Sequence, residues 1–155
     1  MMRLGLFVAT CGYVGYVPVA PGTFGSAVGL ALFAFIRWSG SIAFELGVIA
    51  VLLGLGVWSG NLAEKHFGRV DPAPVVLDEV AGMFITLALI PVNLPGALVG
   101  FLIFRIFDVI KPWPANRLES LPGGLGMMAD DAMAALYGNA AMRILIAVLP
   151  TGWLA

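Results

Sequence analysis

The chain has 155 residues, of which 61% are hydrophobic and only 11% are charged, and its formal net charge is −1. A typical soluble domain carries roughly 25% charged residues, so this composition indicates a membrane protein of one domain, residues 1–155. The chain has no basic excess with which to neutralise a nucleic-acid backbone, which argues against nucleic-acid binding. Cys11 is the single cysteine, which excludes an intramolecular disulfide, and we interpret it as apolar filling.

The first twenty residues resemble a signal peptide, with Arg3, an apolar run from Leu4 and small residues near Ala20. Glycines and a proline interrupt the run, and the segment leads into a glycine-containing motif instead of a cleavage site. We therefore expect the N-terminus to remain in the mature protein.

The hydrophobic segments predict an all-α integral membrane bundle with about four to five hydrophobic helices. The first follows a Gly/Pro-rich loop and covers Ser26 to Trp38. Leu46 to Ala63 is eighteen uncharged residues long, close to the ~20 that a helix needs to cross a bilayer. Val80 to Phe104 is also uncharged, but the prolines of Pro91 to Pro95 predict two helices joined by a tight turn. The last helix is expected from Asp131 to Leu149.

Threading these helices through a bilayer separates the basic residues into two groups. Arg37 and the turn at Pro91 to Pro95 lie on one side. The other side carries Lys65, Arg69, Lys111 and Arg117. The positive-inside rule makes this second side cytoplasmic, and the same threading places most of the acids near it.

Most of the nine acids fall in three windows, Pro72 to Met83, Phe104 to Pro114 and Gly123 to Met133. Two windows hold adjacent pairs, Asp78 with Glu79 and Asp130 with Asp131. Each pair could simply sit at a helix start, where the macrodipole favours negative charge. Two such pairs on one face of a membrane instead favour a metal site, because ionisable groups there are costly without a partner.

Carboxylate oxygens suit Mg2+, Mn2+ or Ca2+, whereas zinc and copper prefer imidazole or thiolate ligands. His66 and Cys11 cannot build a site of that second kind, and we expect His66 to be an exposed loop residue. Mg2+ usually takes only one or two carboxylates and keeps waters, so some of the acids would serve in other ways, for example as a general base.

Phosphate-binding groups lie close to these acids in the sequence. Arg105, Asp108 and Lys111 are spaced i, i+3 and i+6 along one side of a helix, with Lys111 in its last turn, a stripe that could pair internally or bind phosphate. Glycine-rich stretches at Ala20 to Ser26 and Leu121 to Asp131 could present backbone amides to an anion, although such stretches more often mark ordinary turns. In the first stretch, Thr23 or Ser26 could cap the following helix.

Other phosphatase mechanisms lack their residues. Val17 stands where a cysteine phosphatase would need an arginine after Cys11, there is one histidine, and no Asp-x-Asp pair occurs. Phosphate hydrolysis by a metal-activated water is the mechanism that remains.

The strings PGTFGS, DPAPVVLDEVAGM, FRIFDVIKPWP and GGLGMMADD, in this order, resemble the successive motifs of the bacterial phosphatidylglycerophosphatase A family, from about Val19 to Tyr137. The resemblance implies an all-helical fold and Mg2+-dependent hydrolysis of phosphatidylglycerophosphate, a phospholipid substrate in the membrane. It also implies the bacterial inner (cytoplasmic) membrane, where the positive-inside rule predicts an active site facing the cytoplasm.

The family motifs are carried over position by position. The residues implied to bind metal are Asp78, Glu79, Asp130 and Asp131, and Asp108 joins them as catalytic. The residues implied to bind substrate are Gly22, Thr23, Gly25, Arg105 and Lys111. Asp71 matches an acidic position before the Asp-Glu pair and could serve only to orient that loop. His66 lies outside every motif.

Two alternatives stay open. One is a phosphatase for another phosphorylated lipid or a small soluble ester. The other is a divalent-cation transporter, whose acids should be distributed through the bilayer instead of gathering at one edge. The sequence does not decide which acids touch the ion, or whether subunits form a homo-oligomer.

Overall fold

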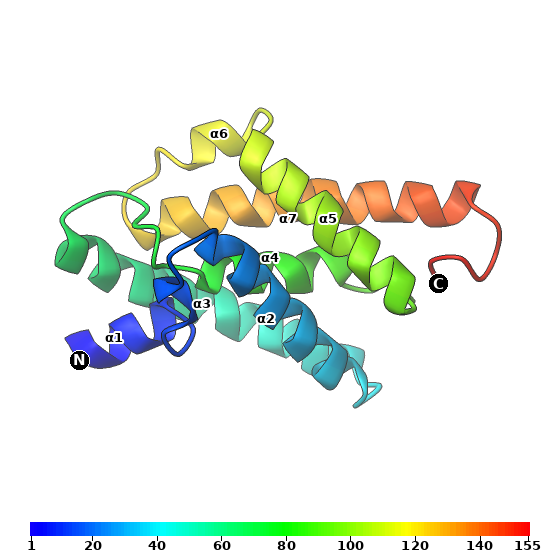
Figure 1. Cartoon of the computed structure of the whole chain (residues 1–155), viewed down its shortest axis with the longest axis horizontal. Helices are drawn as coiled ribbons and strands as arrows, with labels where there is room; N and C mark the ends of the chain where they lie inside the picture. Colours follow the sequence, from blue (N-terminus) through cyan, green and yellow to red (C-terminus); the bar gives the residue numbers. More distant parts are fainter.

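The computed structural model describes residues 1–155 and contains helices but no strands (Figure 1). This confirms the all-α prediction. In chain order the elements are α1 Met2–Ala9, the 3-10 helix η1 Val14–Tyr16, α2 Pro21–Arg37, α3 Ile42–Phe67, α4 Leu77–Leu87, α5 Leu94–Ile110, α6 Ala115–Leu118 and α7 Gly124–Val148.

Helices occur where the hydrophobic segments predicted them, with local signals at their ends. α3 begins after Ser41, whose side chain accepts a hydrogen bond from the Phe44 amide, and it ends at Gly68 in a left-handed conformation. The expected break near Pro91 separates α4 from α5. Asn93 precedes α5, and its side chain accepts a hydrogen bond from the Gly96 amide.

The Gly/Pro-rich stretch near the N-terminus divides in two. Gly12 to Ala20 is a loop around η1, as predicted, but from Pro21 onward the stretch is helical, so the prediction of a loop is wrong there. α2 begins at Pro21, because proline lacks an N–H that a first helical residue would leave unpaired. Ala20 precedes the helix and no side chain caps it. Thr23 and Ser26 therefore lie inside α2, and the expectation that one of them caps the helix is wrong.

The second glycine-rich stretch is also mostly helical. α7 begins at Gly124, so Asp130 and Asp131 are its seventh and eighth residues and do not lie at a helix start. Asp78 and Glu79 do lie in the first turn of α4, as the sequence predicted. His66 is exposed but belongs to the last turn of α3, so the expectation of a loop residue is wrong.

The short helix α4 lies at the centre of the molecule, packed against α2, α3, α5 and α7. Phe84 of α4 packs edge-on against Phe33 of α2, with ring centroids 5.7 Å apart. Gly82 allows α5 to approach, since a β-carbon there would overlap the ring of Phe104. This packing fixes α4 against α2 and α5.

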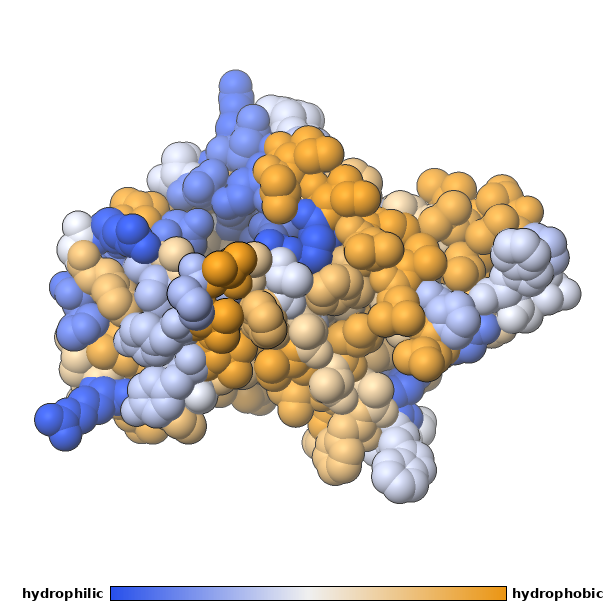
Figure 2. Space-filling view, viewed as in Figure 1, coloured by the Kyte–Doolittle hydropathy of each residue, from blue (hydrophilic) through white to orange (hydrophobic).

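Two helices, α3 and α7, are long and apolar enough to cross a bilayer. Only 17% and 28% of the residues in their most hydrophobic windows are buried, so they are not core helices of a soluble protein. Figure 2 shows hydrophobic residues over much of the face in view. A water-soluble monomer rarely exposes so much contiguous apolar surface, and these features indicate a membrane-associated protein.

Candidate active site

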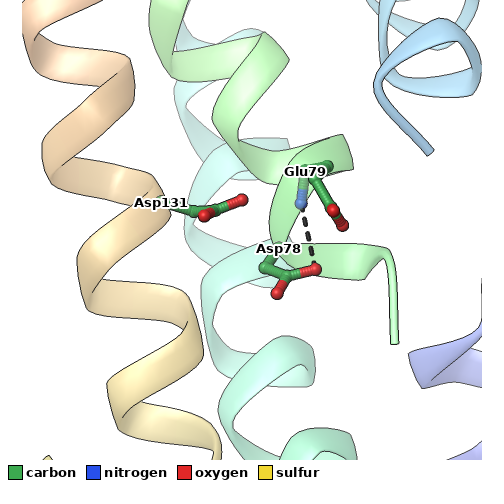
Figure 3. A group of neighbouring side chains, drawn as sticks. All are labelled: Asp78, Glu79 and Asp131. Carbon is green, nitrogen blue, oxygen red and sulfur yellow. Dashed lines mark hydrogen bonds between the residues drawn. The ribbon is translucent and has the colours of Figure 1, made fainter. Parts of the chain in front are cut away.

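Three carboxylates from two helices converge at the start of α4. Asp78 and Glu79 come from the first turn of α4, and Asp131 comes from α7 (Figure 3). One oxygen of each lies within 4.8 Å of the others. Asp78 and Asp131 are each only 5% exposed. The acid pairs that are far apart in the sequence therefore meet in one place.

These carboxylates lack enough hydrogen-bond donors. Oε2 of Glu79 and Oδ2 of Asp131 are buried with no partner, and Asp78 Oδ1 accepts a hydrogen bond only from the Glu79 amide, at 3.1 Å. Burial and the neighbouring Glu79 raise the pKa of Asp78 well above its usual value. Burial likewise raises the pKa of Glu79 to about 8. A cation would offset this repulsion, so the three oxygens fit a hard divalent ion.

Arg105 lies beside the carboxylate cluster and is held by three groups. Its Nη1 atom is 2.5 Å from Oδ2 of Asp108 and 3.7 Å from Oε1 of Glu79. The same nitrogen donates to Oγ of Ser26 at 3.4 Å, and the Ser26 hydroxyl donates to the Gly22 carbonyl. One fifth of the Arg105 side chain is exposed, so a substrate anion can reach it.

Lys111 is the second cation of the site, but it does not continue the Arg105–Asp108 stripe. It follows α5 in a left-handed conformation, just beyond the last turn in which it was expected. Its Nζ donates to Oδ2 of Asp130 on α7 at 2.5 Å and lies 3.5 Å from Oε1 of Glu119. Burial lowers the pKa of Lys111, but the bond to Asp130 outweighs that effect and raises it, so Lys111 stays charged.

Asp130 faces a different partner from its neighbour Asp131. Its Oδ2 pairs with Lys111, and its Oδ1 accepts a hydrogen bond from the Asp131 amide. It does not belong to the three-carboxylate cluster. Direct metal binding by Asp130 stays a prediction, and the contacts favour a role in orienting Lys111.

The glycines of α2 provide space for the site. A β-carbon on Gly22 would overlap Oε1 of Glu79 and lie 3.1 Å from both terminal nitrogens of Arg105. One on Gly25 would come within 2.7 Å of Cβ of Val76. These residues thus let a helix pack closely on the start of α4, where a flexible phosphate loop was expected. Thr23 is partly buried next to them, and phosphate contact by Thr23 stays a prediction.

Sequence reasoning missed two contributors to the site, Ser26 and Glu119. Ser26 was considered only as a helix cap, although its spacing of four residues from Gly22 is the spacing of neighbours on a helix. Glu119 lies outside all three acidic windows. Asp71 is exposed in the segment before α4, and its negative charge helps to raise the pKa of Lys111.

Comparison with known proteins places this site in a family. The family model described as Phosphatidylglycerophosphatase A matches residues 7–146. Two proteins named Phosphatidylglycerophosphatase A are similar: the Escherichia coli protein is 37% identical over 77% of this chain and 70% of its own length, and the Haemophilus influenzae protein is 35% identical over 79% and 77%.

A Bacteroides thetaiotaomicron protein, provisionally named a phosphatidylinositol-3-phosphatase, is 34% identical over 86% of both chains. No solved structure matches the chain. The family match covers all three acidic windows and most of the chain. On this evidence the chain belongs to the phosphatidylglycerophosphatase A family.

Proposed function

We propose that this chain is a Mg2+-dependent phosphatase that removes the terminal phosphate of phosphatidylglycerophosphate and leaves phosphatidylglycerol. The observation that carries the proposal is the cluster of Asp78, Glu79 and Asp131, in which two buried oxygens have no partner and Arg105 is the neighbouring cation. The names of the Escherichia coli and Haemophilus influenzae relatives support the substrate.

Asp78, Glu79 and Asp131 would hold the Mg2+ ion, since their oxygens are hard ligands and two of them lack any other partner. When bound, the ion supplies Lewis-acid chemistry, polarising the phosphoryl oxygen and making a nearby water a better nucleophile.

The chain's own cations would bind the phosphate and offset the negative charge that develops during hydrolysis. Asp108 orients Arg105, and Asp130 orients Lys111, each through a hydrogen bond of 2.5 Å. Because both cations are fixed by partners on the protein, little reorganisation is needed when the substrate arrives. Asp78 and Asp131 are each 5% exposed, so bulk water has little access to their carboxylates.

We also propose an integral membrane bundle in the bacterial inner membrane, spanned by α3 and α7, with the site facing the cytoplasm. Asn61, near the end of α3, accepts a hydrogen bond from the Gly124 amide at the start of α7. The cationic end of α3, with Lys65, therefore lies on the same side as the acidic end of α7. The positive-inside rule favours the cytoplasm for that side.

A second candidate substrate is a phosphoinositide with a phosphate monoester on its ring. The Bacteroides thetaiotaomicron relative, whose match covers 86% of both chains, carries that kind of name. The same carboxylates and cations would serve for either lipid, because both present a phosphate monoester at the membrane surface. A cation transporter is less favoured, because the clustered acids lie together at one end of α4.

The test is a panel of phosphate esters assayed with the purified full chain in detergent micelles, with Mg2+ or with a chelator. The panel contains phosphatidylglycerophosphate, phosphatidylinositol 3-phosphate and glycerol 3-phosphate. We expect the first to have the highest kcat/KM and the chelator to abolish turnover. A preference for the soluble ester would overturn the lipid assignment, and full activity in the chelator would overturn the metal assignment. Asp131→Asn serves as the inactive control.

A further inference from the structure

A groove of about 390 Å3 lies between the end of α5 and the outer face of α7. Its first wall is formed by Phe107, Pro112 and Trp113. The other wall is formed by residues of α7, namely Tyr137, Ala140, Ala141 and Ile144. The Tyr137 hydroxyl is already used, because it donates to the Trp113 carbonyl at 2.9 Å. The lining is therefore apolar, and the volume falls within the roughly 300–1,000 Å3 of small-molecule sites.

The groove begins next to the proposed phosphate-binding cation. Lys111 directly precedes Pro112, and its amide donates to the carbonyl of Phe107 at 2.8 Å. On α7, Tyr137 follows Asp130 by seven residues, which places it on the same side of the helix, about 10 Å further along. Ala141 and Ile144 continue that side of α7 by steps of four and three residues. The groove thus leads from the Lys111–Asp130 pair along α7.

We propose that this groove binds an acyl chain of the phosphomonoester lipid whose phosphate is held at Lys111. The inference rests on the proposed function, because it requires a lipid substrate. A phosphate lipid needs a cation and an apolar surface joined without a gap, and residues 107–113 provide both. α7 is also one of the two helices able to cross a bilayer, so a chain lying along it would run from head-group level into the hydrocarbon.

The surface around the groove fits this occupant. Figure 2 shows a polar patch near α6 and hydrophobic residues continuing beside it over α5 and along α7. Trp113 is 68% exposed and Ile144 is 63% exposed, large apolar side chains that would contact lipid in a bilayer. Ala140 and Ala141 are small, and they leave the space between Tyr137 and Ile144 open.

Replacing Ala140 and Ala141 by larger residues would fill the groove without removing an existing side-chain contact. The variant Ala140→Leu/Ala141→Leu places larger side chains in the groove, and leucine is a good helix former. Ala147→Leu is the matched control, because Ala147 is exposed on the same helix and does not line the groove.

The first experiment compares dioleoyl and dihexanoyl phosphatidylglycerophosphate in mixed micelles with Mg2+. The filled variant should raise KM for the long-chain lipid about tenfold, because a few methylenes lose their burial, and leave kcat/KM for the short-chain lipid within about twofold. Ala147→Leu should match the parent enzyme on both lipids. Equal losses on both lipids, or no loss on either, would overturn the proposal.

A second experiment does not depend on turnover. Lipids with brominated acyl chains quench tryptophan, so the fluorescence difference between the parent protein and Trp113→Phe reports chain contact at the groove. In a chelator, brominated phosphatidic acid should quench this signal saturably and more strongly than brominated phosphatidylcholine. In Ala140→Leu/Ala141→Leu, the two lipids should quench the signal equally. Equal quenching by both lipids in the parent protein would overturn the groove assignment. If neither phosphatidylglycerophosphate is hydrolysed, the proposed function fails while the quenching still decides the groove.

Discussion

The two ends of α4 both bury carboxylates, but only one end supplies them with partners. At the C-terminal end lies Glu45 of α3, which is 2% exposed. Its Oε2 accepts from Arg37 at 2.7 Å, and its Oε1 accepts from the Leu89 amide at 3.1 Å. Arg37 also donates to the Ile90 carbonyl. Every charge at this end has a hydrogen-bonded partner, so the arrangement holds α4 in place.

At the N-terminal end, Asp78, Glu79 and Asp131 share a single nearby cation, Arg105, which is itself bound to Asp108. Two buried oxygens have no donor. Removing charges from water is costly unless they are paired, so a fold gains no stability from this end as it stands. The contrast indicates that paired buried charge serves the fold, whereas unpaired buried charge of one sign serves a ligand.

The largest expected effect is a loss of activity on substitution at the N-terminal end of α4. Asp131→Asn should lower kcat by about a hundredfold or more, the scale for losing one electrostatic contact at a reacting group. Its melting temperature in a chelator should not fall, because the substitution removes a repelling charge. Initial rates with Mg2+ and thermal unfolding in the chelator measure the two effects.

Glu79→Gln should behave in the same way, because it removes a charge from the same cluster. If both variants kept near-normal activity, the metal-site hypothesis would be wrong even for an active phosphatase.

The reverse pattern is expected at the other end of α4. Glu45→Gln should destabilise the protein by about 3 kcal/mol, because it leaves Arg37 without its counter-charge. This is near the lower end of the range for broken buried pairs, since about a third of the Arg37 side chain is exposed and keeps some solvation. The rate per folded molecule should stay within about twofold of the parent value, as judged by assays normalised to the folded fraction.

An additional Arg37→Leu substitution should recover part of the stability lost in Glu45→Gln, since it removes the charge left unpaired. If Glu45→Gln were fully folded but inactive, Glu45 would belong to the catalytic machinery. The contrast between a structural and a catalytic end of α4 would then be wrong.

The sequence predicted the acidic end of α4 better than the paired end. Adjacent acids before apolar helices are conspicuous, because charge is scarce in this chain. Glu45 and Arg37 are single charges eight residues apart in different helices, and no local pattern indicates that they meet at α4. Sequence reasoning could thus find the candidate site but not the residues that hold its central helix.

The sequence also could not assign roles within each motif. Asp130 and Asp131 are neighbours, and a helix turns by about 100° per residue, so they must point differently. Which of them meets Asp78 depends on how α7 packs against α4. Gly22 and Gly25 predicted a turn, whereas close packing against Glu79 and Val76 requires them inside a helix.

Counted per pH unit, the smallest effect is a pH dependence of stability, and it tests whether the acidic end is unpaired without metal. Unfolded Glu loses its proton near pH 4.3, whereas folded Glu79 keeps its proton until about pH 8. Between these values the folded state binds more protons than the unfolded state, so stability falls as pH rises, by about 1.4 kcal/mol per pH unit for this one group. The melting temperature in a chelator should therefore decline from pH 5 to pH 8.

Saturating Mg2+ should remove most of this decline, because the ion binds the ionised carboxylates and stabilises the folded state more as pH rises. Glu79→Gln should make the chelator curve less steep, because it deletes one of the titrating groups of the cluster, while Glu45→Gln should shift the whole curve downward without changing its slope. A parent protein whose melting temperature rises over this range would show that the carboxylates at the start of α4 are ionised and stabilised without metal. The protein would then stabilise the buried carboxylates at both ends of α4, and the two ends would differ only in geometry.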